Sequence, residues 1–265
     1  MLYFHFRLGV CPTPWRAVQM RKVLLRSVLL AVLTLAPGSV AAQEDEFVQL
    51  VDVPTARCLP RGTYSLGVRV VPNGGLIGGM RVGLAPYLLV GVSYGARNVV
   101  GTGEPEWDNS VEFDIKVRVA EEYEIVPALA VGFDSRGYGR QLEDGGFEKV
   151  SPGFYIAGTK TLPYSQHWHL HFGLSRTLDI ERTRPDFFAG VSARFSQEFS
   201  TLVEYQYAQD QAREDGSATG FLNVGFRWVF VGQVEIDIFF RNLAGPSGSP
   251  DLNSRSIGFV FYDSF

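Results

Sequence analysis

The sequence predicts an all-β protein, an antiparallel transmembrane β-barrel of about 12 strands. After Arg61 almost no stretch carries apolar residues at helical spacing, whereas many stretches alternate strictly between apolar and polar residues. In SVEFDIKVRV the apolar side chains share one face of a strand, and Glu112, Asp114, Lys116 and Arg118 share the other. QVEIDIFFR and TLVEYQYA repeat the pattern. Each of these segments is therefore expected to be a strand with one polar and one apolar face.

Twelve segments have this strand pattern. They are residues 62–71, 76–84, 88–97, 110–119, 125–134, 150–160, 166–176, 187–195, 200–208, 219–229, 231–241 and 254–262. Most are about 9 to 11 residues long, the length that a tilted strand needs to cross a bilayer. Short turns alternate with long loops between them, as at the two ends of an outer-membrane barrel. In the first hairpin, PNGG predicts a tight turn with Asn73 and Gly74 at positive φ.

Alternation by itself fits both a soluble barrel, which hides its apolar face, and a membrane barrel, which turns that face toward lipid. Charged residues occupy the polar face of nearly every strand, so an inward apolar face would need a very large common core. Aromatic residues also lie at apolar-face or strand-end positions, as interfacial girdles require. They are Tyr64, Tyr87, Tyr94, Trp168, Phe187, Phe195, Tyr207, Trp228 and Phe240. We therefore expect a lipid-facing barrel, with a soluble periplasmic β protein as the alternative.

The N-terminus resembles a secretory signal peptide that begins at Met20. Arg21, Lys22 and Arg26 precede an apolar run that ends in small residues, so cleavage is expected before Gln43. The uninterrupted apolar core, 27–36, is shorter than the roughly 20 residues of a membrane-spanning helix. The expected organisation is an extension and signal peptide over 1–42, a periplasmic segment over 43–61 and the barrel over 62–265.

Charge and cysteine content narrow the functional classes. The first 42 residues hold five basic and no acidic side chains, so residues 43–265 carry 19 basic against 28 acidic groups, a net charge of about −9. An acidic chain is a poor nucleic-acid binder, and no nucleic-acid partner is expected. Cys58 is the single cysteine after residue 42, so no intramolecular disulfide is expected.

The polar faces of the strands supply the candidate site residues. The predicted lumen-lining side chains are Glu112, Asp114, Lys116, Arg118, His167, His169, His171, Arg194, Glu204, Arg227, Glu235 and Asp237. Lys116 and Arg118 are expected either to pair with Asp114, Glu235 or Asp237, or to line a path for an anionic polymer or solute. The Gly-rich, mixed-charge stretch 135–149 is expected to be an exposed loop.

Three histidines stand at alternate positions in HWHLHFGLS and share one face of a strand. His167 and His171 lie roughly 13 Å apart on such a strand, too far to bind the same ion, although neighbouring histidines are close enough. The flanking strands offer no good third ligand. Lumen-facing polar side chains are therefore the favoured interpretation, with metal binding as the alternative. Neither a metal nor a cofactor is predicted.

The stretch GVSYG matches the G-x-S-x-G pattern of a hydrolase nucleophile elbow. That elbow requires a sharp strand-to-helix turn after the serine, whereas Ser93 is predicted in the middle of a strand with no helix following. Small lumen residues are the favoured interpretation. A lipid-modifying enzyme that uses Ser93 or the histidines remains a third functional hypothesis.

Two longer stretches are similar to the YjbH family of outer-membrane proteins, which is associated with exopolysaccharide synthesis and export. The resemblance covers the first half of the chain after residue 42, in LVDVPTARCLPRGTY and VEFDIKVRVAEEYEIVPALAVGFDSRGYG. The matching residues are Pro54, Thr55, Ala56, Arg57, Leu59, Pro60 and Gly62, then Asp114, Lys116, Arg118, Glu121, Glu122, Pro127, Ala128, Gly132, Asp134, Gly137 and Gly139. The resemblance implies a non-enzymatic barrel that supports envelope or exopolysaccharide secretion.

The expected location is the cell outer membrane, with both termini periplasmic. Phe265 resembles the terminal aromatic residue that barrel assembly machinery reads, and the expected partners are that machinery, outer-membrane lipid and exopolysaccharide or secretion components. Passive, porin-like diffusion of solutes through the lumen is the main alternative function. The number of strands does not decide whether solutes pass, because the lumen of a twelve-stranded barrel is intermediate in width between a side-chain-filled barrel and an open porin.

Overall fold

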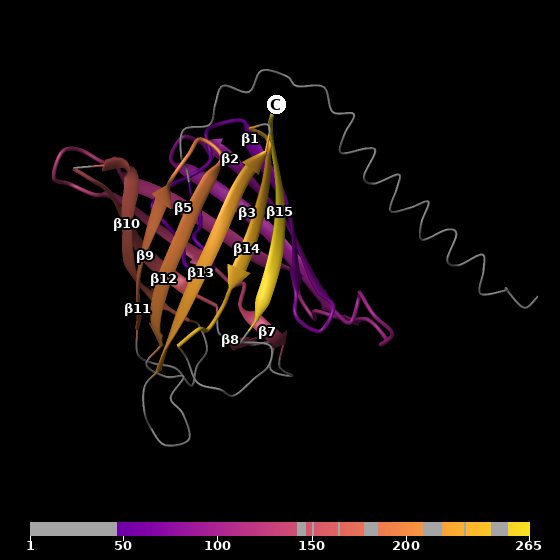
Figure 1. Cartoon of the computed structure of the whole chain (residues 1–265). Helices are drawn as coiled ribbons and strands as arrows, with labels where there is room; N and C mark the ends of the chain where they lie inside the picture. The colour runs from indigo at the N-terminus through magenta and orange to yellow at the C-terminus, as the bar shows by residue number, and fades with distance from the viewer. Residues whose placement is uncertain are drawn as a thin grey trace, which may run out of the picture. The chain divides into compact units, whose positions relative to one another are not determined.

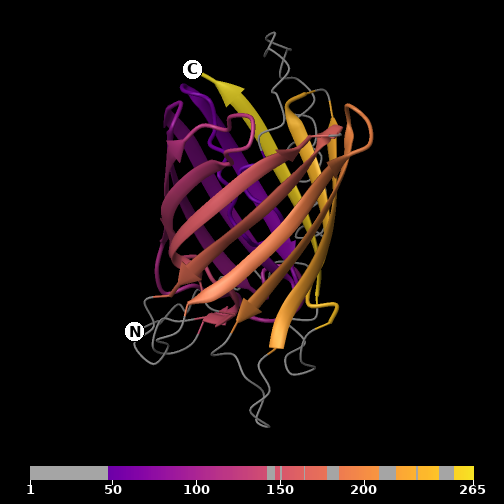
Figure 2. The same ribbon diagram turned by 90° about the vertical axis from the view of Figure 1, so that its left-hand side faces the viewer.

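The computed structural model describes residues 47–141, 147–149, 151–163, 165–177, 185–208, 219–230, 232–244 and 254–265. Within these residues, twelve antiparallel strands follow one another around a closed barrel (Figure 1). Barrel closure comes from β1 and β15, which pair from Thr63 with Ser264 to Val70 with Ile257. Figure 2 shows the strands tilted against the long axis, as closure of a sheet into a barrel requires. The twelve-stranded all-β prediction is confirmed.

The barrel strands match the twelve predicted segments to within a few residues. They are β1 (Thr63–Val71), β2 (Gly75–Ala85), β3 (Leu88–Arg97), β5 (Glu112–Ala120), β6 (Ala128–Asp134), β9 (Gly153–Leu162), β10 (Ser165–Arg176), β11 (Asp186–Arg194), β12 (Phe199–Ala208), β13 (Thr219–Phe230), β14 (Val234–Phe240) and β15 (Arg255–Ser264). β6 starts three residues later than predicted, because Tyr123 and Val126 close a tight turn with Glu124 at φ 27°. The described residues contain no helix long and apolar enough to cross a membrane.

Turn chemistry sets the first hairpin as predicted. Asn73 and Gly74 have φ of 55° and 65°, and Gly75 donates its N–H to the Pro72 carbonyl at 3.1 Å. Two successive residues at positive φ match the right-handed twist of the flanking strands, which aligns β1 with β2. The predicted signal peptide, by contrast, lies outside the described residues.

Three further strands occur in loops. β4 (Glu106–Trp107) extends the pairing of β3, and β7 (Tyr138–Gln141) pairs with β8 (Phe147–Lys149). The prediction that 135–149 is an exposed loop is wrong for its described residues, because Arg136, Tyr138, Phe147 and Lys149 are all buried. Arg136 forms an ion pair with Asp108 and lies over the Phe147 ring, so charge pairing and stacking hold this loop against the barrel.

The two faces of each strand differ as the alternation predicts. In β5, Phe113 and Ile115 are 53% and 46% exposed, whereas Glu112 and Lys116 are 6% and 1% exposed. The large exposed apolar side chains of the other strands include Leu66, Val68, Met80, Val92, Phe154, Ile156, Leu170, Phe172, Val203, Phe226, Ile238, Ile257 and Phe259. This arrangement is the reverse of a soluble barrel, which would bury these side chains in a common core.

Aromatic side chains gather at the end of the barrel that carries the short turns. Phe199 stacks on Trp228 with ring centroids 5.6 Å apart, and Trp228 also meets Phe230 edge to face. Trp168 and Phe195 form a similar edge contact across the β10–β11 pair. Rings at this level are suited to the boundary between lipid and water, where one part of the side chain is apolar and another is wet.

The N-terminal segment lies inside the barrel. Residues 47–56 form a small hairpin: Leu50 donates its N–H to the Val53 carbonyl at 3.0 Å, and Thr55 donates to the Val48 carbonyl at 3.3 Å. Leu50, Val51 and Cys58 have no exposed surface. We predicted 43–61 as a periplasmic segment separate from the barrel; its described residues up to Leu59 instead occupy the lumen, because the wall offers apolar contacts and polar partners to them. We call residues 47–59 the lumen segment.

Candidate functional site

The inward face of the wall holds most of the predicted site residues. Glu112, Asp114, Lys116, His169, His171, Glu204, Arg227, Glu235 and Asp237 are buried, Arg118 and Arg194 are partly buried, and His167 is exposed. His167 differs because the β9–β10 register shifts between Ser165 and His169, so it precedes the regular alternation of β10. Lys116 and Glu204 bind the lumen segment directly.

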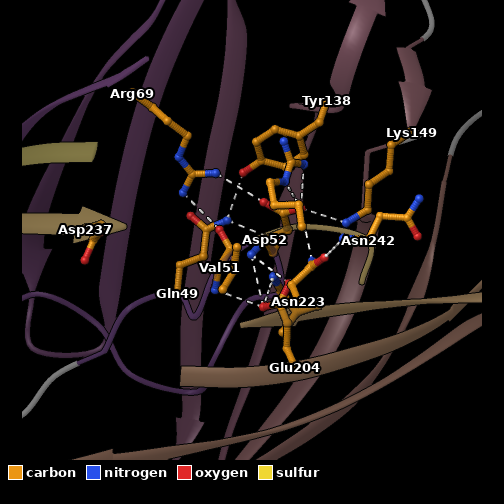
Figure 3. Close-up of polar contacts among 12 residues, drawn as sticks. Gln49, Val51, Asp52, Arg69, Tyr138, Lys149, Glu204, Asn223, Asp237 and Asn242 are labelled. Carbon is orange, nitrogen blue, oxygen red and sulfur yellow. Dashed lines mark hydrogen bonds and ion pairs between the residues drawn. The ribbon is translucent and has the colours of Figure 1, made fainter. Parts of the chain in front are cut away.

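Asp52 at the tip of the hairpin receives three cations from the wall and from a loop strand (Figure 3). Arg241 donates from Nε and Nη2 to its Oδ2 at 3.0 and 2.6 Å, and Lys149 donates to the same oxygen at 2.8 Å. Arg69 donates to Oδ1 at 3.1 Å. Burial alone would raise the pKa of Asp52, but the charges of Arg241, Lys149 and Arg69 lower it well below its usual range. The Asp52 carboxylate thus accepts hydrogen bonds from three cationic side chains.

Glu204 of β12 binds the backbone of the same hairpin tip. Its carboxylate accepts the N–H groups of Val51, Asp52 and Val53 at 2.9 to 3.1 Å. Asn223 of β13 donates to Glu204 Oε1 at 2.7 Å (Figure 3). A turn this tight leaves backbone donors without partners in the chain itself, and a buried donor must be satisfied. Glu204 therefore supplies what the hairpin cannot supply locally.

Side chains of β2 and β5 bind the two flanks of the lumen segment. Lys116 donates to the Val48 and Arg57 carbonyls at 2.6 and 3.2 Å, and Arg81 donates to Gln49 Oε1 at 2.7 Å. We expected Lys116 either to pair with a wall carboxylate or to line a path for an anionic polymer or solute. It binds hairpin carbonyls instead, because the lumen segment lies directly against β5.

Carboxylates of the wall pair with arginines. Asp114 accepts from Arg81 Nε at 2.9 Å, Asp237 accepts from Arg227 Nε at 2.8 Å, and Glu235 forms an ion pair with the same Arg227 nitrogen at 3.0 Å. The expected partners of Arg118, namely Asp114, Glu235 and Asp237, are thus engaged with Arg81 and Arg227. Arg118 forms an ion pair with Glu121 at 3.0 Å and donates to the Pro86 carbonyl at 2.9 Å.

Glu122, in the short turn after β5, fastens the outgoing end of the lumen segment. Its carboxylate accepts from Arg57 Nη2 at 2.8 Å, Lys160 Nζ at 3.0 Å and Thr161 N at 2.7 Å. Burial would raise the pKa of Glu122, but the hydrogen bonds from Lys160 and Thr161 and the charge of Arg57 lower it. We call the Arg57–Glu122 pair the rim latch, since it joins the lumen segment to the short-turn rim.

Apolar packing completes the attachment. Phe47, Leu50, Val51 and Val53 form one buried cluster with inward side chains of the wall, namely Tyr155, Ala157, Phe188, Leu202 and Phe239. Gly190 of β11 leaves the space that Leu50 fills, because a Cβ added there would lie 2.4 Å from Leu50 Cδ1. The lumen of this half of the barrel is therefore shaped to the hairpin as well as charged for it.

His171 belongs to a buried hydrogen-bond chain, and His169 Nδ1 lies 3.1 Å from Thr161 Oγ1. Thr159 Oγ1 accepts the Ala56 N–H at 3.0 Å and lies 3.0 Å from His171 Nδ1, and His171 Nε2 lies 3.0 Å from Ser192 Oγ. With the hydroxyl hydrogen of Thr159 donated to Nδ1, Nε2 carries the proton and donates to Ser192. Among the described residues, no cluster of three or more His, Cys, Asp and Glu is placed to hold a metal ion. Thr159 therefore connects the lumen segment to the wall, and His171 contacts Thr159 from β10.

Ser93 lies in the middle of β3, opposite Gly79 of β2 and Glu112 of β5. The chain continues as a strand to Arg97, so the sharp turn into a helix that a nucleophile elbow needs is not formed here. Ser93 lines a cavity in the lumen, together with Gly79 and Gly91 of the neighbouring strands. Its position thus agrees with a small residue that leaves room in the lumen.

Space remains on the β1–β3 side of the lumen segment. One cavity of about 130 Å³ is lined by Gln49, Arg69, Arg81, Asp134 and Tyr138, with glycines of β1, β2 and β3 widening it. A smaller cavity of about 30 Å³ shares Ile77, Arg136 and Tyr138 with the first and extends past Arg241. Two cavities thus remain beside the lumen segment, and the larger one has room for several water molecules.

Comparisons with known proteins assign no family to this chain. The sequence matches no protein-family profile, and no curated protein matches it either. Among solved structures, it is similar to the KdgM porin, with 8% identity, a TM-score of 0.46 and coverage of 77% of this chain and 99% of that one. The COG4313 outer membrane channel from Pseudomonas putida F1 has 13% identity and a TM-score of 0.44, with 80% and 100% covered. The NanC porin has 10% identity and a TM-score of 0.39, with 77% and 97% covered.

Several residues of the site are missing from the predicted set. Asp52, Arg69, Arg81, Lys149 and Asn223 all contribute to binding the lumen segment. Arg69 and Arg81 lie on the polar faces of predicted strands. The same alternation that identified Glu204 could therefore have predicted that they point into the lumen. Asp52 and Lys149 lie outside those strands, where no periodicity predicts which way a side chain points.

Proposed function

We propose that this chain is a channel-forming barrel of the outer membrane whose lumen is occupied by its own N-terminal hairpin. The outward apolar side chains support a position in lipid, because a face of this kind has no protein partner to cover it. The hairpin supports the channel, since it fills the lumen as a separate segment while polar cavities remain beside it. With the predicted signal peptide, we expect the short turns and both termini on the periplasmic side.

The observation that carries the proposal is the way in which the wall binds the hairpin. Residues 47–56 attach through hydrogen bonds, ion pairs and side-chain packing, so they can leave the lumen while the barrel strands stay paired. The Glu204 carboxylate accepts hydrogen bonds from three backbone N–H groups of the hairpin tip. A change at Glu204 is therefore expected to act on the occupancy of the lumen.

Conductance in planar bilayers tests this function. Wild-type protein is expected to conduct in rare, small steps, whereas Glu204→Gln is expected to open at least tenfold more often. The reason is that hydrogen bonds to a charged acceptor contribute roughly 1.5–3 kcal/mol each, and 1.4 kcal/mol corresponds to a factor of ten in the equilibrium. Glu198→Gln is the matched control, because Glu198 is exposed in the β11–β12 turn. Assembly of each variant is checked by its changed gel mobility without heating.

A second variant tests whether the barrel conducts, independently of how strongly the hairpin is attached to the wall. Deletion of residues 47–56 removes the hairpin and is expected to leave a permanently conducting barrel if the variant assembles. An assembled barrel that lacks the hairpin and still does not conduct would overturn the proposed channel.

A role in exopolysaccharide secretion is the second candidate function. It is supported by the contact between the two stretches that resemble the YjbH family: Lys116 donates to the Arg57 carbonyl, and Arg57 pairs with Glu122. Both stretches thus cooperate in holding the lumen segment. Deleting the gene in its host and measuring secreted polysaccharide tests this role, and unchanged secretion would count against it.

A further inference from the structure

We infer that the hairpin tip occupies a binding site for a small carboxylate, and that Asp52 takes the place of this solute while the lumen is filled. The inference rests on the proposed channel and names the class of solute that such a channel binds. It depends on the arrangement around Asp52, on the charge that remains if the hairpin leaves, and on the adjoining space.

The geometry around Asp52 is that of a carboxylate receptor. Arg241 directs two N–H groups at one oxygen and Lys149 adds a third donor, while Arg69 binds the other oxygen. All three cations surround the ring of Tyr138, with Arg241 4.2 Å, Arg69 5.4 Å and Lys149 5.7 Å from its centroid. The ring therefore helps to keep the charged groups in place when the carboxylate changes.

Charge favours an anion in the place of Asp52. Three cations face this one carboxylate, and the nearby Glu204 directs its oxygens at the hairpin backbone and Asn223. Departure of the hairpin leaves three cations and Glu204 at this level of the lumen, a local excess of positive charge. It also frees Lys116 from the Val48 carbonyl of the hairpin, to which its ammonium donates at 2.6 Å. Buried cations without anionic partners are costly, so a free carboxylate is expected to bind there.

Space for the rest of a solute adjoins these cations. Arg69 and Tyr138 line the cavity of about 130 Å³, and Arg241 and Tyr138 line the smaller one. Gln49 of the hairpin contributes to the larger cavity, so its departure widens the space further. Polar groups of Arg81, Asp114 and Asp134 around the cavity can bind hydroxyl groups of a solute.

The test uses the full chain with Asp52→Asn, which keeps the shape of the side chain and removes its charge. Glucuronate and glucose serve as probes, since they share a sugar ring and differ in the carboxylate. Titration calorimetry in detergent is expected to show glucuronate binding to Asp52→Asn at least tenfold more tightly than glucose, and at least tenfold more tightly than to wild type. Adding Lys149→Gln to Asp52→Asn is expected to weaken glucuronate binding about tenfold. The control, Arg255→Gln, removes an exposed cation at the start of β15 and is expected to leave glucuronate binding unchanged.

Bilayer recordings separate the two proposals. Asp52→Asn channels are expected to prefer chloride over potassium, and millimolar glucuronate is expected to reduce their current more than glucose does. Conducting channels with equal responses to both sugars, and equal calorimetric binding, would overturn the carboxylate site and leave the channel in place. Tight glucuronate binding to an assembled barrel that never conducts would support the site and contradict the channel. If Asp52→Asn fails to assemble, the same titration is made with Glu204→Gln, where equal binding of the two sugars also overturns the site.

Discussion

Single carboxylates decide how the lumen segment is held. Asp52 belongs to the lumen segment and binds three cations. Glu204 and Glu122 belong to the barrel: Glu204 binds the backbone of the segment, and Glu122 binds the segment's Arg57. Each of them is surrounded by donors from at least two parts of the chain. The lumen segment is therefore attached at both its tip and its outgoing end.

The rim latch gives a prediction of pH dependence. The pKa of Glu122 is lowered in the folded chain, so its contribution to stability is present above the ordinary glutamate pKa, about 4.3, and is lost as pH falls through the lowered folded value. Cys58 has no exposed surface in the lumen segment, so thiol labelling reports its departure. In a Cys11→Ser chain, labelling with dithiodipyridine is expected to be constant from pH 8 to 5 and to accelerate below about pH 4.

A charge-neutral variant checks the cause of that acceleration. Glu122→Gln is expected to label about tenfold faster than wild type already at pH 7, because hydrogen bonds to a charged group contribute roughly 1.5–3 kcal/mol. Glu121→Gln is the neighbouring control, since Glu121 is exposed and pairs with Arg118. If both variants label at the wild-type rate, Glu122 does not hold the segment.

At the scale of the strand, β5 shows why alternation predicts so much. Its side chains alternate between an exposed apolar set and a buried charged set, as the pleat of a strand requires. Strand existence and the identity of the two faces could therefore be predicted from the sequence. Exact ends could not, because Gly153, at φ 63°, and the late start of β6 depend on how neighbouring strands meet.

Lysine substitutions along β5 test which face meets lipid. Ile115→Lys places a charge in the middle of the outward face and is expected to destabilise the barrel in vesicles by about 2–4 kcal/mol. Val111→Lys, on the same side just before β5, is expected to cost only about 0–1 kcal/mol, since a charge near the interface reaches water. Urea titration of the folded, unheated gel band measures both. Equal stability of the two variants would contradict a lipid-facing exterior.

At the scale of the whole molecule, the barrel has two unlike ends. Short turns, Gly62 and the C-terminus share one end, where Phe265 donates its N–H to the Gly62 carbonyl at 2.9 Å. The charged tip of the lumen segment reaches toward the other end, where β8 and the residues after β14 supply Lys149 and Arg241. Solutes that enter from the long-loop end would meet these cations first.

Epitope tags test this orientation. A tag after Gly216, between β12 and β13, is expected to be accessible to antibody on intact cells, because long loops of outer-membrane barrels are extracellular. A tag after Gly232, between β13 and β14, is expected to be accessible only after permeabilisation. Gly232 has φ 71° and open space around it, so the insertion is tolerated structurally. Antibody binding in the reverse pattern would invert the barrel in the membrane.

The sequence by itself determined the twelve strands, the Asn73–Gly74 turn and the division into apolar and polar faces. These features depend on contacts between near neighbours, so a period of two and local turn chemistry are enough to predict them. Only the tertiary structure placed the lumen segment. Its partners, such as Glu204 and Arg241, lie far away along the chain and converge only when β1 pairs with β15. Closure creates the enclosed space in which Asp52 finds three cations, and no periodicity along the chain encodes which segment fills it.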